Sequence, residues 1–407
     1  MSSYIRKMYE DATWLAFDLE TTSRHKGSYF GATPYDPENK VVMGGSFGLA
    51  EFAILSMDED LADVWAGIVG RLVQGNVVLV GCNIGFDLSW VMAQMPLSWK
   101  LRRKNILVWD ISVAHYLMCG QAEKYPSMDK IAEHWKLPVK PDTLKRYMDE
   151  GVDVDDIPKT ELFEYLRHDL ETTREIARRQ IEAFGGISAV PEIYLIRMDD
   201  ILMTTEMQVN GMCFSSEISG ELAEESLPIL DKLEEHLQGY ATACIGQDVG
   251  FNAGSPAQLA TFLYGGEFKW TVKEVMTDSF GNPLLVKSGK TKGSVKTKIV
   301  EKKLTFGGVL PSAITDKYDS RTTDEERLTE LRNSTHRAGM GLVADWVDTL
   351  LRARTLRKDI STYYHGYQAF AELDGFIHTN LNQTGTVTGR LSSSSPNLQN
   401  AAHSTED

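Results

Sequence analysis

The chain of 407 residues is long enough for two or three domains, since a domain typically takes roughly 100–200 residues. Its hydrophobic content of 42% and charged content of 24% are ordinary for a globular protein, and no stretch approaches the roughly 20 apolar residues of a membrane span. The formal net charge of −15 argues at first against nucleic acid as a partner, but net charge is a weak guide when charge is unevenly placed.

The amino-terminal segment MSSYIRKMYEDATW lacks the apolar core of an export signal. The four cysteines lie far apart and form no CxxC pair, which argues against a zinc site or a disulfide framework. Both features fit a reducing compartment. We therefore expect a cytoplasmic location, in a bacterial or phage-infected cell, and no membrane partner.

Residues 12–185 have the pattern of an alternating α/β domain. WLAFDLE and NVVLVG are short β-rich runs bounded by polar residues or glycine, which predicts strands, and VVMGGSFGLAEFAIL indicates a hairpin. Helical periodicity marks DLADVWAGIVGRLVQ and KTELFEYLRHDLETTREIARRQIEAF. The clustered Gly, Ser and Pro residues of FGGISAVP indicate a domain joint at 184–191.

Residues 195–247 and 341–370 have the periodicity of amphipathic helices. Between them, residues 268–306 alternate on both sides of a Gly-Asn-Pro turn, which predicts a β excursion. Nine lysines and three acids between Phe268 and Leu304 give this excursion a charge of +6. Two interpretations stay open: a solvated hairpin edge guarded by lysines, and a flap that contacts phosphates.

Two acids interrupt the apolar run of WLAFDLETT. Side chains alternate between the faces of a strand, so Asp18 and Glu20 point the same way. Two neighbouring carboxylates repel unless they are protonated or joined by a cation. The alternative is an edge strand with its polar face outward. The leading apolar residues favour a central strand, and therefore a cation site.

Two further segments carry polar groups that could join these acids. VVLVGCNIGFDLSWVM puts Asn83 and Asp87 just beyond a second apolar strand, and ligand sites of α/β sheets lie at the carboxyl ends of strands. EYLRHDLETT puts Tyr165 and Asp169 four residues apart, on one face of a helix. Each pattern alone also arises by chance, and a tyrosine on an amphipathic helix usually belongs to the core.

In this order, the segments Asp18-Leu19-Glu20, Asn83-Ile84-Gly85-Phe86-Asp87 and Tyr165-Leu166-Arg167-His168-Asp169 resemble the three motifs of the DEDD-type 3′–5′ exonucleases. VWDISVAHYL and SMDKIAEHWKLP resemble the helices between those motifs. Position 164 is Glu where one subtype has His, so the resemblance is to the Tyr subtype. It implies an α/β ribonuclease H-like domain with a mixed sheet and flanking helices.

The resemblance also implies a role for each motif residue. Two-metal nucleases hold two divalent cations about 3.5–4 Å apart, and oxygen-only ligands favour Mg²⁺ or Mn²⁺ over zinc. Tyr165 would orient the attacking water. Leu19 and Phe86 would pack against the terminal base or sugar, and Asn83 would support the substrate strand. The metal ligands would be Asp18, Glu20, Asp87 and Asp169.

The second half of the chain resembles the family A DNA polymerases, in the phage-type form that lacks an amino-terminal 5′-nuclease domain. The segments that carry the resemblance are LMTTEMQVNGMCF, FNAGSPAQLATFLYG, LLRARTLRKDISTYY and IHTNLNQTGTVTGRLSSSSPNLQN. It implies an exonuclease domain at 1–190, a mainly helical thumb at 191–370 with an inserted β excursion at about 268–306, and the start of a palm at 371–407. Its partners would be a single-stranded DNA 3′ end at the exonuclease site and a primer-template duplex at the thumb.

Several basic and amide side chains are expected to contact this DNA. Arg354 and Lys358 lie four apart on one helix face, which suits backbone phosphates; a solvated basic helix face is the alternative. By resemblance, Arg390 is a minor-groove probe near the primer end, and Gln399 and Asn400 contact template or primer. The glycines of TGTVTGR would let the backbone approach closely.

The sequence shows no DYSQIELR-like segment, nucleotide-binding helix or His-Asp-Glu segment, which family A chemistry needs. We therefore expect a proofreading 3′–5′ DNA exonuclease that forms part of a split or truncated polymerase and is not competent for synthesis alone. A second chain would supply the fingers and the remaining palm. The alternatives are a DNA-binding assembly subunit and, less favoured, a ribonuclease D-like enzyme.

Overall fold

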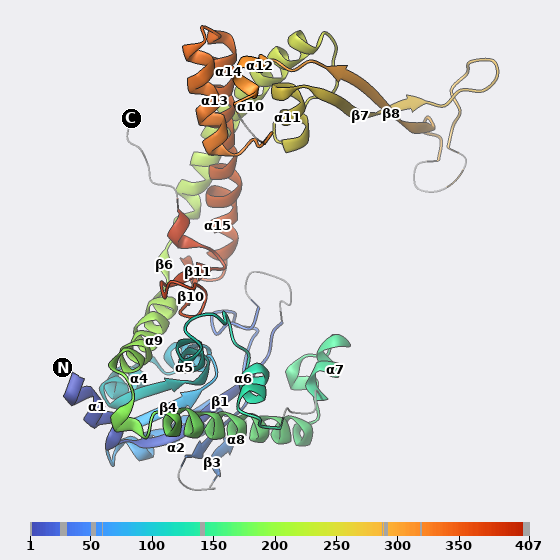
Figure 1. Ribbon diagram of the computed structural model, residues 1–407. Coiled ribbons are helices and arrows are strands. Elements are labelled where there is room, and N and C mark those ends of the chain that lie inside the picture. The colour runs from blue at the N-terminus through green and yellow to red at the C-terminus, as the bar shows by residue number, and fades with distance from the viewer. Residues whose placement is uncertain are drawn as a thin grey trace. The chain divides into compact units, whose positions relative to one another are not determined.

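The computed structural model describes residues 2–24, 31–49, 54–58, 60–138, 143–286, 288, 292–317 and 320–401 (Figure 1). The chain divides into two compact units. Unit 1 combines Met1–Ser216 with Tyr367–Asp407, and unit 2 is Glu217–Gly366. Within the described ranges, no helix has both the length and the apolar character that a membrane crossing requires.

Unit 1 is built on one five-stranded mixed sheet in the order β3-β2-β1-β4-β5. Strands β1, β4 and β5 are parallel, and β2 is antiparallel to both of its neighbours. The predicted strands WLAFDLE and NVVLVG are the adjacent β1 and β4, and the predicted hairpin is β2 with β3. The strands are β1 (Thr13–Thr21), β2 (Val41–Gly48), β3 (Ile54–Asp58), β4 (Val77–Gly81) and β5 (Ile106–Asp110).

Both faces of this sheet are covered. Alternation along β1 sends Leu15, Phe17 and Leu19 into the main core, which α2, α3 and α9 complete. The opposite face carries Ala16, which packs with leucines of α8 in a second cluster. The helices of the amino-terminal part are α1 (Ser2–Glu10), α2 (Leu61–Leu72), α3 (Gly85–Gln94), α4 (Pro96–Arg102), α5 (Ile111–Met118), α6 (Met128–His134), α7 (Thr143–Asp149), α8 (Lys159–Ala183) and α9 (Glu192–Asn210).

The boundary of unit 1 differs from the predicted joint at 190/191. Helix α9 belongs to unit 1 because Tyr194, Met198 and Leu202 are buried in the sheet's own core. The residues expected to begin a palm also belong to unit 1. There, β6 (Met212–Cys213) pairs with β9 (Phe376–Ile377), and β10 (Asn380–Asn382) pairs with β11 (Ser392–Ser394).

Unit 2 is mainly helical and has its own core. Phe262 and Trp346 lie at its centre with ring centroids 4.7 Å apart, and the Trp346 indole N–H donates to the Leu237 carbonyl at 3.2 Å. Helix α14 also packs along α13. The helices are α10 (Ser216–Ile245), α11 (Pro256–Tyr264), α12 (Ser312–Thr315), α13 (Glu325–Arg337) and α14 (Gly341–Lys358), followed by a π-helical turn (Asp359–Tyr364). The next helix, α15 (His365–Phe370), passes from unit 2 into unit 1 at Tyr367.

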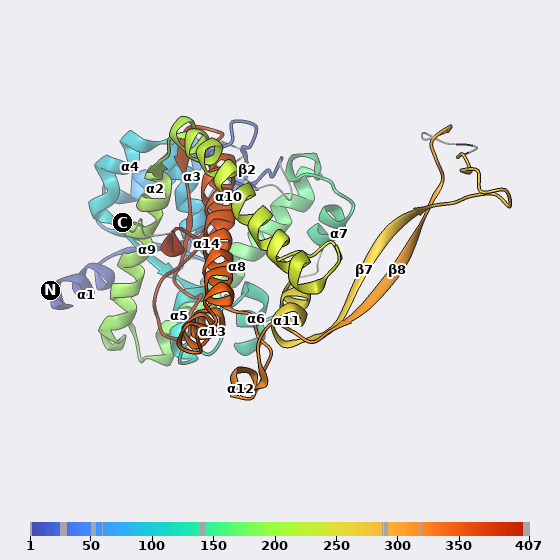
Figure 2. The same ribbon diagram turned by 90° about the horizontal axis from the view of Figure 1, so that it is seen from above.

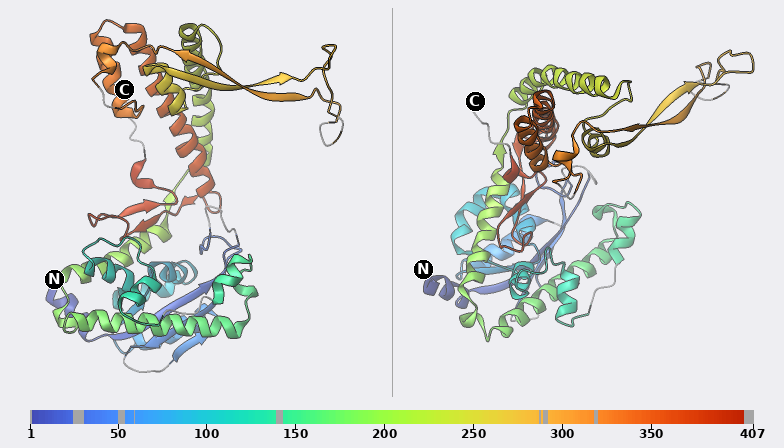
Figure 3. Two further views of the ribbon diagram at one scale, coloured as in Figure 1. Left: turned by 45° about the vertical axis from the view of Figure 1, so that its right-hand side comes forward. Right: turned by 45° about the horizontal axis from the view of Figure 1, so that its top comes forward.

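The Lys-rich excursion is an antiparallel hairpin of β7 (Gly266–Val275) and β8 (Thr297–Phe306). Phe268 at its base is buried in the core of unit 2, and the hairpin then extends away from the helices of that unit (Figures 2 and 3). Lys298 and Lys302 pair with Glu274 across the ladder. These ion pairs engage two of the nine lysines within the hairpin, which favours the lysine-guarded edge over the phosphate flap.

Candidate active site

Strand β1 carries two half-buried acids at the centre of the sheet. Asp18 lies opposite Gly45 of β2 and Glu20 lies opposite Met43, so both carboxylates leave the strand on the face that α8 covers. The ladder shifts register immediately after Glu20. Irregularities of this kind re-aim side chains and are common beside functional sites.

Helix α8 brings Asp169 to these acids. Leu162, Leu166 and Leu170 are fully buried against the face of the sheet that carries Ala16, which fixes how α8 lies over β1. Asp169 shares this inner side of the helix and is 6% exposed. One carboxylate oxygen each from Asp18, Glu20 and Asp169 lie within 4.8 Å of one another. Tyr165, one turn earlier on α8, is partly buried and packs against the apolar cluster of Ala16 and these leucines.

The fourth acid, Asp87, enters from the first turn of α3. The ladder between β1 and β4 ends at Ala16, and the Leu19 backbone N–H donates to Asp87 Oδ1 at 3.0 Å. Burial raises the pKa of Asp87 well above its usual range, and the charges of Asp18 and Glu20 raise it further. Asp87 therefore lies within electrostatic reach of the β1 acids, although it is outside the 4.8 Å group.

This donor set fits a hard divalent cation. All four groups are carboxylates, and oxygen ligands suit Mg²⁺ and Mn²⁺. Like charges held this close are unfavourable without a proton or a cation between them. His168 Nδ1 lies 3.9 Å from Asp169 Oδ1, beside the cluster. Asp18, Glu20 and Asp169 would hold a cation, and Asp87 would add a further ligand from α3.

The expected substrate contact of Leu19 is wrong. Its side chain is 5% exposed and lies in the main core, on the face of the sheet opposite Asp18 and Glu20. The Leu19 side chain packs directly over Gly44 of β2, where an added Cβ would lie 2.6 Å from Leu19 Cδ2. What Leu19 gives to the site is its backbone N–H, which holds Asp87.

Asn83 and Phe86 occupy the turn between β4 and α3. Asn83 is exposed, with a φ of 59°, and its carbonyl accepts from the Phe86 N–H at 2.9 Å. Both side chains line a cleft of about 860 Å³ that is bounded on its other side by residues such as Tyr35, Tyr125 and His378 of the same unit. The four acids are not among its lining residues. The turn that contributes Asn83 and Phe86 to the cleft directly precedes Asp87 in the sequence.

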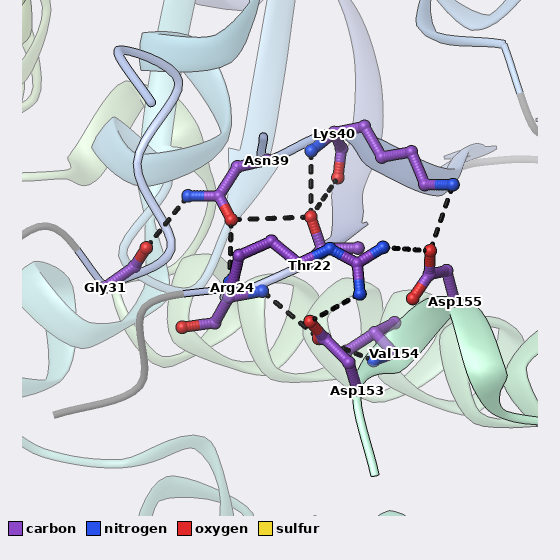
Figure 4. A network of polar contacts seen from close by, with 9 residues as sticks. Thr22, Arg24, Gly31, Asn39, Lys40, Asp153, Val154 and Asp155 are labelled. Atoms are coloured by element: carbon purple, nitrogen blue, oxygen red, sulfur yellow. Dashed lines mark hydrogen bonds and ion pairs between the residues drawn. The ribbon is translucent and has the colours of Figure 1, made fainter. Parts of the chain in front are cut away.

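A polar network fastens the end of β1 to the segment that leads into α8 (Figure 4). Arg24 Nη1 lies 3.2 Å from Asp153 Oδ2, and Lys40 Nζ lies 3.0 Å from Asp155 Oδ2. Asn39 Oδ1 accepts from the Arg24 backbone N–H at 2.9 Å. The network holds the two elements that carry Asp18, Glu20 and Asp169 in fixed relation, at the end of β1 nearest the acids.

Sequence reasoning missed Asp110, which positions the turn before Asp87. It ends β5, is 3% exposed and caps α5 by accepting from the backbone N–H groups of Ser112 and Val113. Its second oxygen accepts from Ile84 N–H at 2.9 Å. Burial raises its pKa, although these N–H groups oppose the shift. The Asp at a strand end before a helix in VWDISVAHYL was the available N-cap signal.

The expected DNA contacts fall on both units. On α14, Arg354 is half-buried and its Nη1 donates to the Thr323 carbonyl at 2.6 Å, whereas Lys358 is exposed. Burial is the main reason that the pKa of Arg354 is lowered. The other three expected contacts, on unit 1, are exposed: Arg390, Gln399 and Asn400.

The segment that carries Arg390 is docked within unit 1. The Tyr116 hydroxyl donates to the Thr386 carbonyl at 2.5 Å, and Arg197 Nη2 donates to the Gly389 carbonyl at 2.5 Å. A Cβ on Gly385 would lie 2.4 Å from the Tyr125 hydroxyl. The glycine at position 385 therefore permits a close approach of the backbone to the Tyr125 side chain of the same protein.

Comparisons with known proteins match a family model to the carboxyl-terminal part and a relative to most of the chain. Residues 298–407 match the model of DNA polymerase family A. DNA polymerase I of Helicobacter pylori strain J99 is 25% identical over 326 residues, which cover 78% of this chain and 28% of that protein. The thermostable DNA polymerase I of Thermus filiformis is 39% identical over 94 residues, 23% of this chain and 10% of that protein. The chain thus spans less than a third of these relatives' lengths.

One solved structure has the same overall fold. It is the POL domain of Pol1 from M. smegmatis in complex with a DNA primer-template and dNTP. The superposition has a TM-score of 0.53 at 17% sequence identity and covers 100% of this chain and 55% of that one.

Replacing Asp110 tests its positioning role. Asp110→Ala leaves the buried Ile84 N–H without its acceptor and removes the cap of α5, so we expect the free energy of unfolding to fall by about 2–4 kcal/mol. Urea denaturation followed by tryptophan fluorescence measures this. Asp60→Ala is the matched control, because Asp60 is an exposed cap of α2 and its loss should cost only about 1 kcal/mol. If both variants lost the same free energy of unfolding, Asp110 would act only as a helix cap and would have no positioning role at Ile84.

Proposed function

The chain carries a DNA polymerase I-like, family A segment at residues 298–407, and from this premise we propose that unit 1 is a metal-dependent 3′–5′ DNA exonuclease that proofreads for such a polymerase. The observation that carries the proposal is the convergence of Asp18, Glu20 and Asp169 within 4.8 Å, from two elements far apart in sequence. Two divalent cations, Mg²⁺ or Mn²⁺, are the proposed cofactors.

The topology of unit 1 supports the proposal. The order β3-β2-β1-β4-β5, with β2 antiparallel to β1, is a mixed sheet of the kind expected for a ribonuclease H-like domain. The acids lie on the central strand of this sheet and on helices packed against it. Such a rigid support suits catalysis, since metal ligands need fixed geometry.

Each residue of the site has a task in phosphodiester hydrolysis. Bound cations would neutralise the charge that develops on the attacking and leaving oxygens. Asp18, Glu20 and Asp169 would hold them, and Asp87 would complete the set while its bond to Leu19 keeps α3 against β1. The Tyr165 hydroxyl would orient the attacking water. Asn83 and Phe86, which line the cleft, would receive the terminal nucleotide.

Neutralising single acids tests the assignment. Asp18→Asn and Asp169→Asn each remove one ligand charge, and we expect the rate of Mg²⁺-dependent single-stranded DNA degradation to fall roughly 10²–10³-fold. A 5′-labelled oligonucleotide measures the rate and gives the polarity, because 3′–5′ cleavage produces a ladder of shortening labelled fragments. An RNA oligonucleotide of the same sequence tests the ribonuclease alternative.

Glu164→Gln is the matched control for these variants. Glu164 lies on the same helix but is exposed and pairs with Arg167 at 2.6 Å, so its loss should leave the rate unchanged. An unchanged rate in Asp18→Asn, or a loss of rate in Glu164→Gln equal to that in Asp169→Asn, would remove the basis of the assignment.

The tyrosine has a separate test. Tyr165→Phe keeps the ring that packs against the second cluster and removes only the hydroxyl. We expect kcat to fall while KM and the Mn²⁺ concentration for half-maximal activity stay the same, since the hydroxyl would act on water and not on the cation. Single-turnover kinetics over a Mn²⁺ titration separate the two effects. A shift in metal dependence alone would make Tyr165 a part of the cation site.

A second proposal concerns duplex DNA. The exposed Lys358 and Arg390 support primer-template binding. In the alternative of a DNA-binding assembly subunit, duplex binding would be the chain's function without hydrolysis. Single-strand hydrolysis and duplex binding are separable, because Asp18→Asn should abolish the first and leave the second. The prediction of a partner chain with fingers and palm, and of a cytoplasmic location, stays a prediction.

Charge reversal tests duplex binding. Lys358→Glu and Arg390→Glu should weaken duplex affinity and lower the slope of log affinity against log salt by about 1 for each lost phosphate contact. Fluorescence anisotropy at several salt concentrations measures both. Lys100→Glu, an exposed position on α4, controls for the change in net charge. Lys298→Glu with Lys302→Glu probes the hairpin, where the ion pairs to Glu274 lead us to expect a smaller effect.

A further inference from the structure

A second group of metal-binding side chains lies in unit 1, in the corner between α5 and α6. His115 and Cys119 are four residues apart at the end of α5, so their side chains share one helix face. His134 is the last residue of α6. One ligand atom from each of these three residues lies within 4.8 Å of the other two. This group involves none of the acids of the proposed exonuclease site.

Glu123, in the connection between the two helices, contacts His115 of this group but is not one of the three residues that meet within 4.8 Å. Its Oε2 lies 3.1 Å from His115 Nε2, and Cys119 Sγ lies 3.5 Å from the same nitrogen. In a tetrahedral zinc site with metal–ligand bonds of about 2.0–2.3 Å, neighbouring ligand atoms are roughly 3.3–3.7 Å apart. The two measured separations are close to these edges.

We propose that His115, Cys119, Glu123 and His134 bind one borderline-soft divalent transition metal, with Zn²⁺ the best-matched ion. Two imidazoles, a thiolate and a carboxylate are the ligand types that zinc takes in proteins. Mg²⁺ and Ca²⁺ are poor candidates because they require oxygen ligands. Binding forms a metal–sulfur bond at Cys119, and the thiol proton leaves to solvent.

The surroundings of His115 support a ligand role. The residue is 1% exposed, so its imidazole is held within the fold. Its polar contacts are made by Nε2, which faces Glu123 and Cys119, while its ring meets that of His134 edge-on at 4.9 Å. An ion pair with Glu123 would account for two of the four groups only. The convergence of Cys119 and His134 on the same point is what a metal explains.

Such a site would be structural, because four protein ligands leave no open position for a substrate. It would fasten the turn between α5 and α6, where Gly120, Gln121 and Tyr125 all have positive φ. Tyr125 binds the family-matched segment, since its backbone N–H donates to the Thr384 carbonyl at 3.4 Å and its hydroxyl lies 3.4 Å from Ser392 Oγ. Metal binding would therefore stabilise the surface on which that segment docks.

Cobalt substitution tests the site in the full-length chain. After chelation, we expect about one equivalent of Co²⁺ to give a sulfur-to-cobalt charge-transfer band in the near ultraviolet, and Zn²⁺ to abolish it. Only a thiolate ligand produces this band, so the carboxylates of the exonuclease site cannot. We also expect the melting temperature of the chelated protein to rise with added Zn²⁺.

Variants decide between this site and any other. Cys119→Ser should abolish the band, and His134→Gln, at an exposed position that tolerates substitution, should weaken Co²⁺ binding by more than about 10-fold. Cys244→Ser, an exposed cysteine elsewhere, should change nothing. Asp18→Asn should keep the band even though it loses nuclease activity. No band in the folded wild-type chain, or a band that survives Cys119→Ser, would overturn the proposal.

Discussion

The electrostatic repulsion among the carboxylates of Asp18, Glu20 and Asp169 is the unfavourable interaction that the packing of unit 1 must offset. Asp18, Glu20 and Asp169 are brought within 4.8 Å of one another by the packing of the elements that carry them. The leucines of α8 are fully buried against β1 and its neighbour, and a network at Arg24 joins the end of β1 to the approach of α8. Apolar packing and more distant ion pairs thus offset the electrostatic repulsion that the acids alone would experience in this arrangement.

Strand alternation explains both what the sequence predicted well and where the prediction was wrong. The rule that puts Asp18 and Glu20 on one face also puts Leu19 on the other, so its assignment as a substrate contact conflicted with the reasoning beside it. The assignment was carried over from a motif, in which a residue's position says nothing of its face. Asp169 was placed by helix periodicity, and the structure brings it to β1.

Other features depended on tertiary packing that local pattern does not contain. Helix α9 has an amphipathic pattern that would suit either unit, and only its burial with the sheet decides which. Sequence reasoning missed the group at His115, because it judged a zinc site from cysteine spacing alone. Its ligands come from two helix ends and the turn between them, and their convergence depends on the path of that turn. The lysines of the hairpin also gained their carboxylate partners through the register of β7 and β8.

The division of the chain has a consequence for its synthesis. Unit 2 interrupts unit 1 in sequence, and β6 can pair with β9 only after all of unit 2 has been made. Domains generally fold as units in the order in which they leave the ribosome. Here the sheet can form early, while the strand edge at Met212 waits for Ile377. The last strands of unit 1 can therefore pair only after every residue of unit 2 has been synthesised.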